Sequence, residues 1–237
     1  MSEPVKKSKK TPESFSPKKP EIVSMMDEAG NKIAQQTVTE SGLIDFEIVK
    51  FGPYRFIGKS VYSRPWDCGK WNPRDFIESQ WEKSEPIFKI LDEMKEYASD
   101  IPYNAGLRHW EIYNPDAGVT HWEEVFFRTQ NELLGSTVGR FMKADTPVPN
   151  GMNSVDIHEM YVAKAWMKGE PKLFDNVCTV VEELMYHEVK KHGYNYVPMF
   201  SAEICPIADQ NGTLMHGSYI ACKPMTDEEK AKENKEE

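Results

Sequence analysis

Apolar and polar positions alternate along much of this chain, and stretches with helical spacing separate the alternating segments. Residues 46–62 alternate and are rich in aromatic side chains, which predicts a strand that is interrupted at Gly52-Pro53. Apolar side chains then recur at helical spacing from Ile87 to Ala98, and two N-cap-like starts with proline predict two helical pieces within 73–98. Further strands are predicted at 107–113, at 121–129 (with a helix over 121–134 as the alternative), at 136–144 and at 153–166.

The second half of the chain repeats this order. A helix is predicted over 171–192, with Gly193 just after its end, and the strands 199–206 and 217–223 should form a hairpin. A Glu-Ile pair followed by a turn with proline comes after each predicted helix, at Glu111 and at Glu203. We therefore predict an α+β fold with duplicated β-α-β-β halves, forming one antiparallel sheet with two main helices on one face and a central ligand groove.

Composition and charge narrow the class of protein. The chain has 237 residues, of which 39% are hydrophobic and 28% charged, as in ordinary globular domains. No apolar run reaches the ~18 residues that a membrane span requires, and no secretory signal is present, so we expect a cytoplasmic protein without membrane contact. The formal net charge is −9 even though residues 1–20 carry six lysines, so the body is acidic and unsuited to direct nucleic-acid binding.

The charge pattern also predicts the domain boundaries. We expect a disordered basic tail over 1–40, one domain over 44–224 and a charged tail over 225–237. The two halves of the domain should cover about 44–145 and 152–224.

Cysteine and histidine spacing gives no sign of a metal site. The four cysteines are scattered without a C-x-x-C pair, which indicates buried, reduced thiols and no disulfide. His187 and His192 lie five residues apart, whereas the zinc motif of metalloproteases needs a spacing of four on one helix face. We expect no metal ion and no cofactor.

The segment from Ile157 to Gly169, the helix after it and the strand around Phe200-Ser201-Ala202-Glu203 together resemble the GyrI-like small-molecule-binding domain. This family is also known as the AraC-type effector-binding domain, and here we take the chain as a stand-alone member. The similarity runs from about Phe46 to Lys223 and includes the Pro-x-Gly link at Pro149-Asn150-Gly151.

The resemblance implies a duplicated β-α-β-β fold whose aromatic cavity binds hydrophobic and often cationic compounds. In multidrug-sensing members an acidic residue on the strand after the second helix contacts the positive charge of the ligand, and Glu203 is the matching position. Tyr161 matches the tyrosine of the strand before that helix. Trp166 replaces a common phenylalanine, and the stretch 113–148 is longer than usual.

The residues themselves support a role for Glu203. Its neighbours are apolar, which predicts partial burial, and a buried carboxylate is costly unless another group compensates its charge. A bound cation would do so, with cation–π attraction from nearby aromatic rings; the alternative is that Glu203 faces solvent. Glu111 is its counterpart in the first half, with a cross-strand ion pair as the alternative. The predicted ligand-binding residues are Glu203, Tyr161, Trp166, Phe200, Trp110, Tyr113 and Glu111.

The residues and the resemblance together imply a protein that binds a hydrophobic, cationic small molecule, and the resemblance implies a role in transcriptional regulation or xenobiotic sensing. The resemblance also implies an alternative, a hydrolase of strained, cyclopropane-bearing xenobiotics, with Glu203 as general base or assisting a nucleophile and Tyr161 orienting the substrate or donating a proton. Another is a protein-interaction role like that of gyrase inhibitors. No Ser-His-Asp or Cys-His pattern points to a different catalytic centre.

Overall fold

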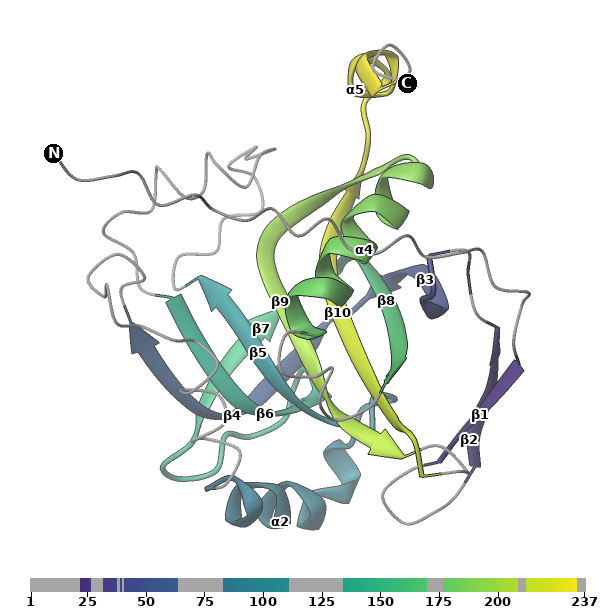
Figure 1. Cartoon of the computed structure of the whole chain (residues 1–237). Helices are drawn as coiled ribbons and strands as arrows, with labels where there is room; N and C mark the ends of the chain where they lie inside the picture. The colour runs from purple at the N-terminus through teal and green to yellow at the C-terminus, as the bar shows by residue number, and fades with distance from the viewer. Residues whose placement is uncertain are drawn as a thin grey trace, which may run out of the picture.

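The computed structural model describes residues 22–26, 32–37, 39, 41–63, 83–110, 134–169, 177–208 and 212–233, and the structural statements below refer to these residues (Figure 1). Its strands are β1 (Ile22–Met26), β2 (Lys32–Thr37), β3 (Ile44–Phe51), β4 (Tyr54–Ser63), β5 (Asn104–Trp110), β6 (Leu134–Lys143), β7 (Asn153–Ile157), β8 (Met160–Gly169), β9 (Tyr194–Ala208) and β10 (Leu214–Pro224). Its α-helices are α2 (Glu85–Glu93), α4 (Val177–Lys191) and α5 (Asp227–Glu233), and a 3₁₀ turn spans Lys95–Tyr97.

Strands β3 to β10 form one antiparallel sheet with the order β3-β8-β10-β9-β5-β6-β4-β7. The sheet-dominated α+β fold that the sequence predicted is therefore confirmed. The order strand, strand, helix, strand, strand occurs twice, in 44–143 and in 153–224. Each of these parts therefore has one strand more than the predicted β-α-β-β unit.

The additional strands arise from two breaks. Residues 46–62 form two strands because Gly52 adopts a φ of 91° and Pro53 has no N–H for a ladder hydrogen bond. The prediction of one strand over 153–166 was wrong, because β7 ends at Ile157 and β8 begins at Met160. At these breaks β3 and β7 each leave their sequence neighbour and pair with a strand of the other half.

Other predicted elements agree with the structure where it describes them. Helix α2 follows Ser84 and has Pro86 in its first turn, α4 ends just before Gly193, and β9 and β10 form the expected hairpin. The first helical piece of 73–98 and the strand or helix after 121 lie mostly outside the described residues.

The two predicted tails contain regular structure. Strands β1 and β2 form a two-stranded antiparallel sheet within residues expected to be a disordered tail. Helix α5 lies within the expected C-terminal tail, and in Figure 1 it stands apart from the sheet.

One face of the sheet curls around an aromatic core. Phe51 of β3 contacts Phe141 of β6 and Tyr219 of β10, with ring centroids 5.3 and 5.9 Å apart, although these strands are not neighbours in the sheet. Trp166 lies on this same face, and its indole ring packs directly on Gly217. A Cβ added to Gly217 would come within 2.9 Å of that ring. The curvature therefore lets side chains from both halves of the sheet fill one core.

The two main helices pack against the opposite face. Ile87 and Leu91 of α2 contact Ile57 and Met142 of β4 and β6. Helix α4 covers the other half, where its buried residues contact β8 and β10: Val181, Met185 and Val189 pack against Ala163, Ala165 and Ile220. The registers of the neighbouring pairs β6–β5, β5–β9, β9–β10 and β10–β8 place both apolar patches on the same side of the sheet.

Gly58 and Gly139 lie directly opposite each other where β4 and β6 approach closely. A Cβ at Gly139 would overlap the carbonyl oxygen of Ile57. We expect Gly139→Ala to lower the free energy of unfolding by about 1–3 kcal/mol, because the two strands would have to separate. Urea unfolding measures this loss. Ser154→Ala, at an exposed position of neighbouring β7, is the control, and equal stabilities of the two variants would contradict the close approach.

Candidate functional site

A strip of polar side chains runs along the middle of the helix-covered face, between the patches covered by α2 and α4. It lies on β6, β5, β9 and β10, and the register explains it: Arg108 pairs with Ser136 and Ser201, and Glu203 pairs with Gly106 and Ser218. Nearly all of its side chains are buried. The members of this polar strip are Asn104, Arg108, Ser136, Ser201, Glu203, His216 and Ser218.

Arg108 holds two carboxylates at the centre of the strip. Its Nη2 donates to Oε1 of Glu203 on β9 at 2.9 Å and to Oε1 of Glu182 on α4 at 2.5 Å. The side chains of Glu182 and Glu203 are only 13% and 11% exposed, while that of Arg108 is 26% exposed. We call these three residues the Arg108 cluster.

The Arg108 cluster carries two acids for one base. Burial raises the pKa of the Glu182 carboxyl above its ordinary value, and the nearby charge of Glu203 raises it further, while Arg108 opposes both effects. Burial also lowers the pKa of His216, so this neighbour adds no positive charge near neutral pH. A second positive charge at this place would remove the remaining imbalance.

Ser218 adds a buried polar atom beside the acids. It lies directly opposite Glu203 on the ladder, is 1% exposed, and its Oγ has no hydrogen-bond partner within the part of the chain that the structure describes. A buried hydroxyl without a partner is costly, so this position favours a polar group brought by a ligand.

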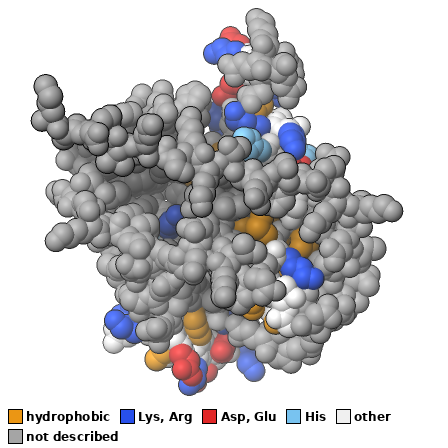
Figure 2. Space-filling view, viewed as in Figure 1, with side chains coloured by type: hydrophobic (Ala, Val, Ile, Leu, Met, Phe, Trp, Pro, Cys, Tyr) orange, Lys and Arg blue, Asp and Glu red, His pale blue; other side chains and the backbone are white. Residues whose placement is uncertain are grey.

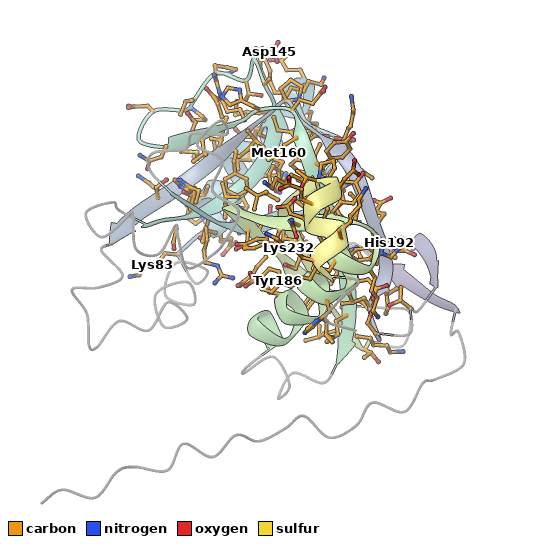
Figure 3. The ribbon with its side chains drawn as sticks, turned by 90° about the horizontal axis from the view of Figure 1, so that it is seen from above. Lys83, Asp145, Met160, Tyr186, His192 and Lys232 are labelled. Atoms are coloured by element: carbon orange, nitrogen blue, oxygen red, sulfur yellow. The ribbon has the colours of Figure 1, made fainter. Side chains whose placement is uncertain are left out.

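Two tyrosine rings lie near Glu182 of the Arg108 cluster. Tyr186 is one helical turn after Glu182 on α4, and its ring centroid lies 4.5 Å from that of Tyr196 on β9. A hydrogen bond joins their hydroxyl groups, and burial raises the pKa of Tyr186 to about 12. Figure 3 labels Tyr186 on α4, well separated from His192 at the end of the same helix. These rings therefore lie toward Glu182, since Tyr196 pairs with Cys222, four residues along β10 from the Ser218 that pairs with Glu203.

The structure separates the residues that the sequence grouped with Glu203. Glu203 is buried as predicted, and Arg108 is the group that compensates its charge. Tyr161 lies on the same face but four residues along β8 from Ala165, which shares the row of Glu203, a separation of about 13 Å. Trp166 faces the aromatic core on the other side of the sheet. Strand parity therefore separates Trp166 from Glu203, and distance along β8 separates Tyr161 from it, while ligand binding by these residues stays a prediction.

The remaining predicted residues are only partly described. Phe200 belongs to β9 and Trp110 to β5, but their side chains are not among those described. Glu111 and Tyr113 lie outside the described residues. Sequence reasoning missed Arg108, Glu182 and Tyr186. Glu182 and Tyr186 lie four residues apart on α4, next to its apolar positions, and this helical spacing is the sequence signal that could have grouped them.

The end of α4 is solvent-exposed, as the spacing of its histidines predicted. His187 and His192 are exposed, and Figure 2 shows His and Lys or Arg side chains together at the surface near α5. Across the described residues, no group of three or more His, Cys, Asp or Glu is arranged to hold a metal ion. Cys222 is a buried free thiol. None of the described helices is long and apolar enough to cross a membrane.

Comparison with known proteins gives a distant structural similarity and no match in sequence. No protein-family model and no curated protein matches the sequence. Among solved structures, the chain is similar to VCH_CASS2, an integron cassette protein from the mobile metagenome of Vibrio cholerae, with 14% identity and a TM-score of 0.38. The alignment covers 75% of this chain and 95% of that one. A similarity this low carries no argument about function.

Proposed function

We propose that this chain binds a hydrophobic organic cation at the Arg108 cluster. The observation that carries the proposal is the pair of buried carboxylates, Glu182 and Glu203, which share one guanidinium nitrogen. Buried carboxylates that stay ionised need compensating positive charge, and one arginine supplies half of what two ionised acids require. A cationic ligand would supply the rest.

The aromatic and polar neighbours favour an organic ligand over a simple ion. The rings of Tyr186 and Tyr196 lie near Glu182, and a ligand cation over such a face gains about 0.5–2 kcal/mol. Ser218 offers an acceptor oxygen opposite Glu203. Small-molecule sites combine these features, namely an apolar or aromatic wall with a few fixed polar groups.

We infer further that the fold is a GyrI-like duplication. Matching β3, β4, β5 and β6 to β7, β8, β9 and β10 leaves the strand order of the sheet the same when read from either edge. Two related halves around a local twofold axis would produce this symmetry. The Arg108 cluster would then lie at the junction of the halves, because β5 and β9 are the central pair.

A hydrolase is the second candidate, and the raised pKa of Glu182 favours it. A carboxyl that keeps its proton nearer neutral pH can act as a general acid or base. In that case Glu182 would transfer the proton, in place of the Glu203 and Tyr161 pair that the sequence indicated.

Replacing Glu203 by Gln tests the proposal. Thermal shift and calorimetry would compare benzamidine, benzyltrimethylammonium and tetraphenylphosphonium with neutral benzamide and anionic benzoate. We expect cations alone to stabilise the wild-type protein and Glu203→Gln to weaken them at least tenfold, about 1.4 kcal/mol.

Glu159→Gln is the matched control, because it removes the same charge from a side chain that is 61% exposed. It should bind cations like the wild type. Equal binding of benzamide and benzamidine, or equal losses in the two variants, would refute the proposal. Mass analysis of each bound compound separates the candidates, since a hydrolase would add one water and a receptor would return the compound intact.

A further inference from the structure

Arg108 occupies the position at which a ligand cation would meet both acids. Its guanidinium reaches from β5 between Glu182 of α4 and Glu203 of β9, and a single nitrogen donates to both carboxylates. We propose that Arg108 is an internal competitor for this site, and that the ligand is a planar cation with N–H donors, an amidinium or guanidinium, which displaces it. This inference rests on the proposed function.

Three described neighbours of Arg108 leave room for its side chain to move. It is the most exposed member of the cluster, and its neighbours on the ladder are small: Ser136 and Ser201 on either side and Gly106 along the same face of β5. No bulky side chain on these three positions encloses the arginine. A change of its side-chain rotamers would therefore open the acids without moving a strand.

The donor geometry selects the class of cation. Both carboxylates now accept N–H hydrogen bonds, and an amidinium would restore both with a similar planar fork. It also has further N–H groups for the hydroxyl of Ser218, which lacks a partner among the described residues. A quaternary ammonium has no N–H group, so it would leave the buried acids and this hydroxyl without donors.

The presence of Arg108 should reduce the affinity for every cation. A ligand binds only the fraction of molecules whose arginine has moved away, and the apparent dissociation constant is the intrinsic one divided by that fraction. Arg108→Met keeps an apolar side chain of similar length and removes the competing charge. We expect it to bind benzamidine at least tenfold more tightly than the wild-type protein.

Two variants and one structure test the inference. Arg108→Met combined with Glu182→Gln keeps the net charge of the cluster, so tighter benzamidine binding by this double variant reports the absence of the competitor and not a change of charge. Arg140→Met is the control, because Arg140 lies on the same face but bonds Asn104 and Asp92 near α2. It should leave the affinity unchanged. In a crystal of the wild-type complex, the amidinium should lie between Glu182 and Glu203 with Arg108 turned away.

Three results would overturn it: unchanged or weaker benzamidine binding by both Arg108 variants, an amidinium located elsewhere in the crystal, or benzyltrimethylammonium bound as tightly as benzamidine. Each can occur while cations still bind in a manner that depends on Glu203, and the proposed function would then stand. If no cation binds the wild-type protein or either Arg108 variant, both the function and this inference are wrong.

Discussion

Phe141→Ala is expected to lower the free energy of unfolding by about 3–5 kcal/mol, because it empties the centre of the aromatic core. The ring is fully buried, and its centroid lies 4.8 Å from that of Phe56, 5.3 Å from Phe51 and 6.3 Å from Tyr219. These partners come from three different strands, so the remaining side chains cannot collapse into the space by moving one element. Urea unfolding monitored by tyrosine and tryptophan fluorescence gives the loss.

Ile90→Ala on α2 is the matched control, since this side chain is 42% exposed and its removal leaves no cavity. Its stability should stay within about 0.5 kcal/mol of the wild type. The loss of unfolding free energy for Phe141→Leu should lie between those for Phe141→Ala and Ile90→Ala. A loss for Phe141→Ala no larger than that for Ile90→Ala would show that the sheet does not curl around this ring.

Elements fixed by local sequence were predictable. Helix α2 begins where Ser84 and Pro86 indicate, and its buried residues Ile87 and Leu91 are four apart. Helix α4 ends at Lys191, two residues before Gly193, whose φ of 75° suits glycine. In such cases the capping residues and the apolar spacing act within one or two turns, so the chain needs no distant partner to specify them.

The candidate site depended on pairings that no local pattern contains. Arg108 meets Glu203 across 95 residues of chain and Glu182 across 74. Alternation assigns a residue to one of two strand faces, but only the register of β5 against β9 decides which acid faces the arginine. For the same reason Tyr161 and Trp166 seemed equally suited to the site, although they lie on opposite faces of β8.

Glu203 shows where physical reasoning from sequence was sufficient. An acid within an apolar strand must be compensated if it is buried, and the structure places it in a buried ion pair. The reasoning did not distinguish between a ligand and a side chain as the compensating cation. That distinction depends on tertiary contacts, and it is the reason why Arg108 is central to both proposals.

Arg108→Met is expected to destabilise the protein by about 3 kcal/mol at pH 8, because it leaves two buried carboxylates without their cation. This value is at the lower end for a buried pair, since the guanidinium is 26% exposed. The loss should depend on pH. The pKa of Glu182 is already raised by burial, and without Arg108 it rises further, so the folded state binds more protons than the unfolded state above the ordinary value of 4.5.

The sign follows from this difference in bound protons. Stability falls as pH rises between 4.5 and the raised pKa of Glu182 in the folded protein, so the deficit of Arg108→Met should be small at pH 4 and largest above that window. Adding Glu182→Gln should recover part of the loss at pH 8. Arg140→Met provides the contrast, because its hydrogen-bond partner Asn104 does not titrate and Asp92 is exposed. A deficit of Arg108→Met that is the same at pH 4 and pH 8 would show that the carboxylates are solvated, and a solvated pair would have no need of a cationic ligand.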